Sequence, residues 1–284
     1  MIMRAMFLVA LVLVAPGIDA AERRFITDEE AARWAGVGIL RMQGSGTCTG
    51  VLIRPDTVLT AAHCVADAGT KTVLPAARIR FHAGWGAGRA VDSIEARTVA
   101  VHQGYFASGA RYDNDKVRVD LARVTLARPA RKVPSYPVGY TPSVGAQLSL
   151  LSYSQGRMDR LSIQPGCAIL RRETEFLSLD CTSNPGASGA PYFQIGRTGR
   201  ATVVGINSGR QVRRSGTRAL ALGFAHARDF IRAGGAGVTA PGIAAGTETG
   251  GRAASTPASA SSAPRRSRLP GGSLPGDGLK RLTR

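Results

Sequence analysis

A serine set between two glycines is the part of this sequence whose chemistry is easiest to define. Residues 181 to 191 read Cys-Thr-Ser-Asn-Pro-Gly-Ala-Ser-Gly-Ala-Pro, which places Ser188 between Gly186 and Gly189. Glycine adopts positive φ without steric cost, so the backbone can turn tightly, expose the serine oxygen and aim successive N–H groups at one point. That point can hold the oxyanion of a tetrahedral intermediate, with donors expected from the N–H groups of Gly186 and Ser188. Taken alone, the pattern also fits an ordinary surface turn.

Two earlier motifs supply the groups that a serine nucleophile requires. A serine hydroxyl needs a base to take its proton, and that base needs an acid to fix its tautomer. Residues 59 to 64 read Leu-Thr-Ala-Ala-His-Cys, and residues 119 to 124 read Val-Asp-Leu-Ala-Arg-Val. We therefore expect His63 to be the general base, Asp120 its acid and Ser188 the nucleophile.

The order of these groups separates two families of hydrolases. His, Asp, Ser is the order of chymotrypsin-type enzymes, whereas α/β-hydrolases run Ser, acid, His and also require glycine where this chain has Ala190. Together with Thr49-Gly50-Val51-Leu52-Ile53, the motifs make residues 25 to 235 resemble the chymotrypsin/trypsin-like serine proteases. The resemblance implies a serine endopeptidase that works through an acyl-enzyme on Ser188, without a cofactor or metal. It also implies an all-β fold of two six-stranded antiparallel barrels, with the active site at their interface and a short C-terminal helix.

The residue before the serine narrows the resemblance. In trypsin-like zymogens this position is an aspartate, which pairs with a newly formed N-terminus to assemble the oxyanion hole. Ala187 stands there instead and cannot form that pair. Residues 181 to 191 are most similar to the bacterial glutamyl endopeptidase branch, in which the position is also uncharged. We therefore expect the zymogen switch to be missing.

The same resemblance points to the residues that select the substrate. No acid stands at Thr182, so a preference for cleavage after lysine or arginine is not expected. Hydroxyl groups opposite an asparagine amide can hold an acidic or small polar side chain. Glutamyl enzymes carry a histidine where Asn207 falls, which leaves cleavage after glutamate as a suggestion. The expected substrate-binding residues are Thr182, Ser183, Asn207, Ser208 and Gly209.

Other acids and histidines are weaker candidates for the catalytic group. Asp113 and Asp115 lie in the polar loop 111–118, where a turn-forming or solvated role is expected. Asp120 instead precedes an alternating pattern that predicts a strand. The remaining histidines, which lack the Ala-Ala-His-Cys context, are expected to be structural or exposed: His82, His102 and His226.

The cysteines indicate an oxidising compartment. Cys48, Cys64, Cys167 and Cys181 have no C-x-x-C spacing of the kind that zinc sites prefer, and two disulfides fit an exported protein. Sequence alone leaves three pairings open. The family resemblance favours Cys48–Cys64 and Cys167–Cys181, which brace the approaches to His63 and Ser188.

The N-terminus has the pattern of an export signal. A positive charge at Arg4 precedes an apolar run over 6–15 and small residues around Ala20, which predicts a signal peptide over 1–20. We expect a secreted or periplasmic bacterial protein, and no later run is apolar enough for a membrane span. Residues 21–34 contain the pair Arg23-Arg24, and they are either a short propeptide, with Phe25 as one possible mature N-terminus, or a solvated lead-in.

The charge of the chain predicts no specific nucleic-acid partner. The net charge is +18, but arginines are scattered and no segment combines a dense basic run with interleaved aromatic residues. A general affinity for anionic surfaces follows from the charge. Protein or peptide substrates are the expected partners, and the protein is expected to be a monomer.

Short apolar runs broken by glycine and proline indicate an all-β fold from Gly36 onward. A proline-containing connector over 130–140 separates two sets of runs. We predict a signal peptide over 1–20, a lead-in and first barrel over 21–129, and a second barrel with a helix at 225–233 over 130–234. The tail, 235–284, is rich in Gly, Ala, Pro and Arg and is expected to be disordered.

Three other functions stay open from the sequence. The chain can be a catalytically silent binding protein on the same scaffold, because a fold does not fix a function. It can be an esterase or another acyl hydrolase that uses the same triad. It can also be a basic cell-surface adhesin in which the tail binds the cell wall.

Overall fold

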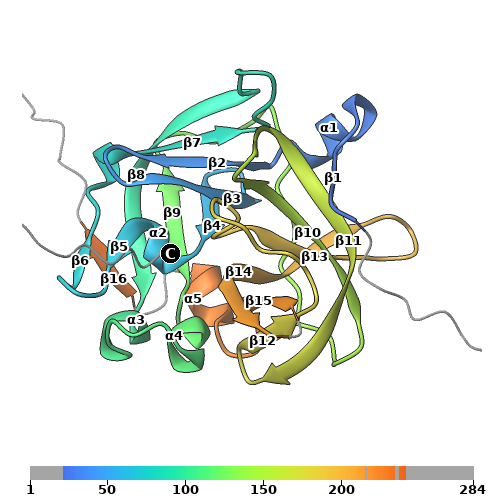
Figure 1. Ribbon diagram of the computed structural model, residues 1–284. Coiled ribbons are helices and arrows are strands. Elements are labelled where there is room, and N and C mark those ends of the chain that lie inside the picture. The colour runs from blue at the N-terminus through green and yellow to red at the C-terminus, as the bar shows by residue number, and fades with distance from the viewer. Residues whose placement is uncertain (1–21, 215, 234–236, 241–284) are drawn as a thin grey trace, which may run out of the picture. The chain divides into compact units, whose positions relative to one another are not determined.

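Two β-barrels make up most of the part of the chain that the structure describes (Figure 1). The computed structural model describes residues 22–214, 216–233 and 237–240. The predicted signal peptide lies outside the described residues, as does most of the predicted tail. No helix within the described ranges is long and apolar enough to cross a membrane.

The first barrel is a closed ring of antiparallel strands in the order β8-β7-β2-β3-β4-β9, and pairing between β8 and β9 closes it. Along β9, buried and half-buried residues alternate, because successive side chains of a strand point to opposite faces. The bounds are β2 (Val37–Met42), β3 (Gly46–Arg54), β4 (Thr57–Thr60), β7 (Ile79–Ala83), β8 (Asp92–His102) and β9 (Ala122–Leu126).

The second barrel repeats this closure in the order β11-β10-β13-β14-β15-β12, with β11 paired to β12. The sequence has two separate apolar runs at 161–163 and 167–171, and the single strand β11 contains both. The prediction of two six-stranded antiparallel barrels is confirmed. The bounds are β10 (Gln147–Ser154), β11 (Arg157–Glu173), β12 (Phe176–Leu179), β13 (Pro191–Ile195), β14 (Ala201–Arg213) and β15 (Gly216–Gly223).

Aromatic side chains join the barrels. Trp34 is almost fully buried, with its ring centroid 5.1 Å from that of Phe193 in the second barrel. Tyr136, in the extended connector, packs edge-on against Phe193 at 4.8 Å. Large buried rings contribute much of the energy of such contacts, so the junction is a continuous apolar core. This core fixes the loops of one barrel relative to those of the other.

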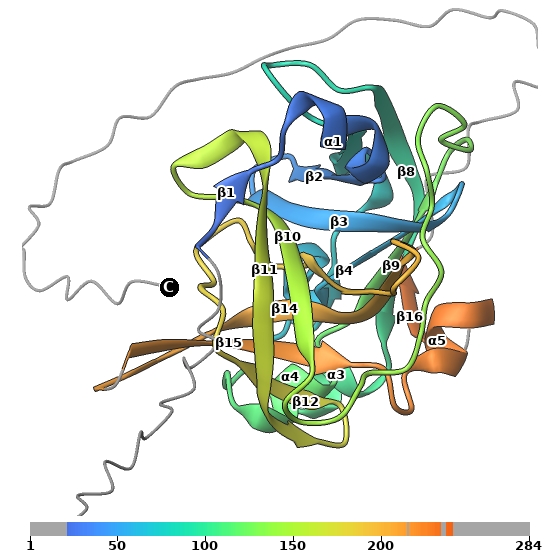
Figure 2. The same cartoon turned by 90° about the vertical axis from the view of Figure 1, so that its right-hand side faces the viewer.

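The N-terminal segment is part of the folded unit and not a solvated lead-in. Strand β1 (Arg24–Phe25) pairs with β11, so it extends the second barrel, although the sequence assigned it to the first (Figure 2). Helix α1 (Asp28–Trp34) then begins with a capping box between Thr27 and Glu30. The hydrogen bond from Arg24 lowers the pKa of Glu30 to about 2.

Short elements complete the fold. The predicted C-terminal helix is present, but it begins at Arg228 and not at residue 225, as α5 (Arg228–Ala233). Strand β16 (Gly237–Ala240) pairs with β8, so the expectation of a disordered tail is wrong for these four residues. The others are α2 (Ala62–Val65), β5 (Ala66–Asp67), β6 (Thr72–Val73), η1 (Ala76–Arg78), α3 (Gly104–Ala107) and α4 (Asn114–Arg118).

Candidate active site

His63 and Asp120 form a two-point contact in the first barrel. His63 lies on α2, just after β4, and Asp120 lies between α4 and β9. The imidazole Nδ1 is 2.7 Å from Asp120 Oδ2, and the backbone N–H of His63 donates to Oδ1 at 2.9 Å. The side chain of His63 is 37% exposed and that of Asp120 only 1%. The buried carboxylate therefore fixes the orientation of the ring through Nδ1.

The surroundings of Asp120 keep it ionised. Burial alone raises the pKa of this carboxyl, but the neighbouring His63 and the hydrogen bonds from His63 and Ser208 outweigh it, so the pKa is lowered. The Ser208 hydroxyl donates to Oδ2 at 2.5 Å. Tyr112 lies within hydrogen-bond distance of Ser208 in turn, at 3.1 Å.

The competing acids lie in other roles. Asp113 caps α4 by accepting from the backbone N–H of Lys116 at 3.0 Å. Asp115 is exposed and forms an ion pair with Arg118. The three other histidines contact different groups. His82 contacts Ser93 and Trp85. His102 packs on Phe230, and His226 lies within hydrogen-bond distance of Glu175.

Both disulfides join the pairs that the family resemblance implied. Cys48–Cys64 ties β3 to the residue directly after His63, and Cys167–Cys181 ties β11 to the segment that leads to Ser188. The sulfurs of the first disulfide lie near the His63 ring. A thiolate is the form of cysteine that binds metal, so this disulfide offers no metal site.

The Ser188 loop requires its glycines. Gly186 has φ +90° and Gly189 has φ +77°. A Cβ on Gly189 would lie 2.1 Å from Thr60 Oγ1, so the loop approaches the first barrel more closely than any side chain permits. The carbonyl of Ser188 accepts from the backbone N–H of Thr49 at 2.9 Å. The serine is thus held by the first barrel although it belongs to the second.

Two backbone N–H groups beside the serine are available to a ligand. Within the described residues, the N–H groups of Gly186 and Ser188 have no acceptor. The carbonyl of Pro185 accepts from Gln155 at 2.7 Å and that of Ala187 from Ala190 at 3.1 Å. Because a trans peptide carries its C=O and N–H on opposite sides, these bonds turn both N–H groups away from the protein. The arrangement suits the binding of an oxyanion.

The side chains of two expected substrate-binding residues, Asn207 and Ser208, are bonded to other groups of the protein. Asn207 is fully buried, and its side chain bonds to Ser183, Ala187 and Tyr192. Ser208 is also buried, with its hydroxyl on Asp120. The side-chain polar atoms of both residues, which were expected from the sequence to contact substrate, therefore bond to other parts of the protein.

The other expected substrate residues differ in exposure. Thr182 is exposed, Ser183 is buried beneath Asn207, and Gly209 is half-buried. A Cβ on Gly209 would lie 2.4 Å from the Tyr112 hydroxyl, which covers this glycine. Thr182 and Gly209 thus stay next to the surface.

Two residues near the site were missed from the sequence. Tyr112 reaches Ser208 from the loop before α4, and no local pattern marks it. Arg23 donates to Ser154 at 3.1 Å, to Gln164 at 3.4 Å and to the carbonyl of Thr182. Burial lowers the pKa of its guanidinium. The sequence singled out Arg23 only as half of a dibasic pair, whereas the structure uses it to hold the segment before the serine.

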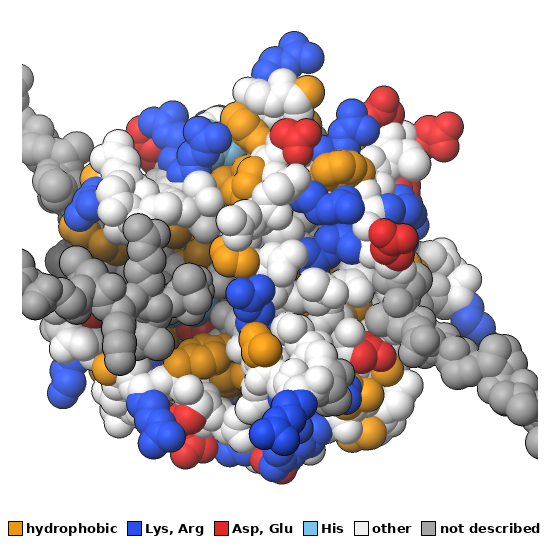
Figure 3. All heavy atoms as spheres, viewed as in Figure 1, with side chains coloured by type: hydrophobic (Ala, Val, Ile, Leu, Met, Phe, Trp, Pro, Cys, Tyr) orange, Lys and Arg blue, Asp and Glu red, His pale blue; other side chains and the backbone are white. Residues whose placement is uncertain are grey.

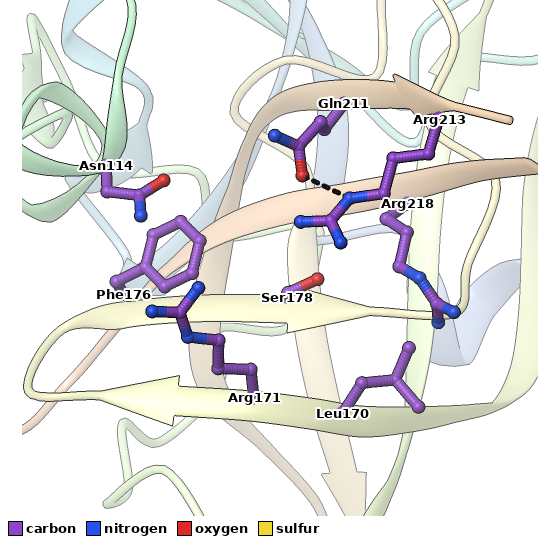
Figure 4. Close-up of a pocket in the computed structure, with 8 residues that line it drawn as sticks. All are labelled: Asn114, Leu170, Arg171, Phe176, Ser178, Gln211, Arg213 and Arg218. Carbon is purple, nitrogen blue, oxygen red and sulfur yellow. Dashed lines mark hydrogen bonds between the residues drawn. The ribbon is translucent and has the colours of Figure 1, made fainter. Parts of the chain in front are cut away.

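An arginine-bearing pocket of about 350 Å³ lies at the outer end of β14 (Figure 4). Arg171 donates to Glu173 and Arg213 to Gln211, and no acidic side chain is among the described residues that line the cavity. Elsewhere, basic side chains are spread over the visible face with acidic ones among them (Figure 3). The lining consists of Asn114, Leu170, Arg171, Phe176, Ser178, Gln211, Arg213 and Arg218.

Residues 48–206, more than half of the chain, match the family model of the trypsin-like peptidase domain. The chain belongs to this family of peptidases. Its predicted likeness to the chymotrypsin-type serine proteases, and within them to the glutamyl endopeptidases, is confirmed by the relatives that it matches.

A curated relative is the glutamyl endopeptidase of Bacillus licheniformis, which is 30% identical over 158 residues. That match covers 52% of this chain and 46% of the relative, so the chain spans about half of the relative's length.

Solved structures agree with the fold. A Glu endopeptidase in complex with MPD has a TM-score of 0.62 at 20% identity, over 76% of this chain and 96% of that one. The VesB protease of Vibrio cholerae has a TM-score of 0.56 at 18% identity, over 75% of this chain and 66% of that one.

Proposed function

We propose that the protein is a secreted serine endopeptidase that hydrolyses peptide bonds through an acyl-enzyme on Ser188. The observation that carries the proposal is the two-point contact of Asp120 with the ring and the backbone of His63. It is the contact that a general base needs if one tautomer is to be fixed. Membership of the trypsin-like peptidase family supports the same reaction.

Each step of the proposed reaction has a group assigned to it. His63 takes the Ser188 proton through Nε2, the ring nitrogen that does not contact Asp120, while the serine oxygen bonds to the substrate carbonyl carbon. The N–H groups of Gly186 and Ser188 receive the oxyanion. His63 then returns the proton to the departing amine as the C–N bond breaks. Water, activated by the same base, hydrolyses the ester and restores Ser188.

The charge of Asp120 serves the transition state. An ionised, buried carboxylate next to the ring stabilises the imidazolium that forms when His63 takes the proton, and Asp120 does not itself accept that proton. Water is largely excluded from the carboxylate, so its interaction with the ring is stronger than that of an exposed pair.

Export and substrate preference are further parts of the proposal. The two disulfides and the N-terminal pattern support a secreted or periplasmic location. For the residue before the scissile bond we propose an acidic or small polar side chain. The exposed Thr182 and the similarity to a glutamyl endopeptidase support this preference, whereas Asn207 does not contribute to it.

The test is cleavage of an unbiased peptide library by the mature protein, read by mass spectrometry. The Ser188→Ala variant is expected to lose about 10⁴-fold or more in rate, because the nucleophile is gone. Ser143→Ala, at an exposed serine, is the matched control and should retain the rate. Equal cleavage by Ser188→Ala contradicts the proposal. Turnover of esters alone points to an acyl hydrolase, and neither activity in folded protein points to a binding role.

A further inference from the structure

Asn207 is a polar residue in the middle of β14 with every side-chain hydrogen-bonding group in use. Its Nδ2 donates to the carbonyl of Ala187 at 3.0 Å and to Ser183 Oγ at 2.9 Å. Its Oδ1 accepts from the Tyr192 hydroxyl at 3.1 Å. Since a carbonyl oxygen can only accept, the amide must turn its nitrogen toward Ala187, which fixes the orientation of the side chain. Asn207 is fully buried, so substrate cannot reach this amide.

The bond to Ala187 acts on one of the two oxyanion donors. The Ala187 carbonyl and the Ser188 N–H belong to the same peptide group and point in opposite directions. Holding the carbonyl against β14 therefore holds the N–H toward the substrate side. Rotation of this peptide would remove the donor and put a carbonyl oxygen in its place.

The backbone of Asn207 restrains the same loop at two more points. Its N–H donates to the carbonyl of Ala190 and its carbonyl accepts from Gly189, both at 2.8 Å. One residue of β14 thus contacts the loop before and after Ser188. Within the loop the Ala187 carbonyl also accepts from the N–H of Ala190 at 3.1 Å, so the Asn207 amide supplies a second donor to the same carbonyl from the neighbouring strand.

We propose that Asn207 is the positioning residue that keeps the oxyanion hole formed, by fixing the peptide between Ala187 and Ser188. It acts through Ser188 and does not touch the substrate. The inference rests on the proposed function of Ser188 as nucleophile. It assigns to Asn207 an effect on the transition state, whereas a specificity residue would change the choice of substrate.

The first test is the kinetics of Asn207→Ala on a library-selected peptide. We expect kcat to fall about 10- to 100-fold, somewhat less than the loss of a whole oxyanion donor, while KM changes less than about 3-fold. Affinity for a peptide aldehyde, which forms a tetrahedral adduct on the serine, should fall by the same factor as kcat/KM. Tyr192→Phe is the control, since it removes the partner of Oδ1 and leaves both Nδ2 bonds in place.

A second variant keeps the test valid if Asn207→Ala does not fold. Asn207→Asp has nearly the same size, but its ionised form cannot donate to the Ala187 carbonyl, so kcat should again fall about 10- to 100-fold or more. Protonation gives the new carboxyl a donor. The activity of this variant relative to the unmodified enzyme should therefore rise as the pH is lowered.

Several results would overturn the inference. These are an unchanged kcat in folded variants, a loss confined to KM or to substrate choice, or a loss in Tyr192→Phe as large as that in Asn207→Ala. A constant activity ratio across pH for Asn207→Asp also contradicts it. If the unmodified protein cleaves no peptide, the proposed function has failed first, and the two failures are thereby distinguished.

Discussion

The two halves of β14 differ in what surrounds them. From Val203 to Ser208 every residue is buried, and the polar side chains of Asn207 and Ser208 bond to the serine loop and to Asp120. From Arg210 to Arg213 every residue is exposed, beside the arginine pocket. One strand thus supports the candidate catalytic group at its inner half and faces solvent at its outer half.

The difference between the two halves separates residues that affect the rate of the reaction from residues that affect substrate recognition. Buried polar groups are satisfied by protein partners, and those partners are unavailable to a substrate. Under the proposed function, a polar residue in the inner half therefore acts on the candidate catalytic residues, while recognition of substrate side chains falls to exposed positions. Substitutions in the inner half should change kcat, and substitutions in the outer half should change KM.

The largest effect is expected at Asp120. In Asp120→Asn the amide cannot hold His63 in the productive tautomer, so kcat/KM should fall about 10⁴-fold with the fold retained. Steady-state kinetics and a thermal melt measure the two quantities. Asp113→Asn, which alters only the cap of α4, should keep nearly full activity. A similar loss of activity in both variants would contradict the role of Asp120 as the acid that orients His63.

An intermediate effect is expected for Ser208→Ala. The hydroxyl bonds to a buried carboxylate, so its loss should cost about 1.5–3 kcal/mol of unfolding free energy at neutral pH and lower kcat more than KM. The native-state pKa of Asp120 is lowered, so the stability it confers is present above the ordinary aspartate pKa and is lost as the pH falls through the lowered native value.

The destabilisation by Ser208→Ala should therefore shrink in acid, as urea unfolding at several pH values can test. Tyr112→Phe, which leaves the bond between Ser208 and Asp120 intact, should be milder. A penalty that is the same at every pH would mean that Ser208 acts through packing alone.

The smallest effect is expected in the outer half. Arg218→Ala should raise KM about 2- to 3-fold for substrates with acidic residues upstream of the cleaved bond, because exposed charge pairs contribute little and are screened by salt. The kcat should not change. Arg218 lies on β15, opposite Gln211 in the outer half of β14, and the control is Val212→Ala, at a residue of β14 that is 73% exposed. A large effect on kcat would erase the distinction between the two halves.

Local patterns in the sequence predicted much of the scaffold. The apolar runs at 37–42 and 57–60 in the sequence coincide with β2 and β4, because a strand with one face in a barrel core shows its burial directly in residue type. The motif around His63 also reflects local structure, because it forms a short helix directly after a buried strand. The glycines around Ser188 are required by the positive φ angles of the backbone there.

Contacts between distant segments could not be predicted in this way. Asn207 belongs to the same polar stretch as Ser208, and only the hydrogen bonds between β14 and the serine loop show that the amide faces Ala187. Arg23 and Tyr112 likewise reach their partners across more than 90 residues of chain. No local pattern of residue types carries this information.

The most direct test of the account is labelling of the mature protein with a fluorophosphonate, followed by mapping of the adduct by mass spectrometry. The probe bonds to a serine that is activated by its base and its oxyanion hole. The account predicts a single adduct on Ser188 that is absent in Ser188→Ala and forms much more slowly in Asp120→Asn. Absence of labelling in folded, processed protein, or an adduct on another serine, would contradict it.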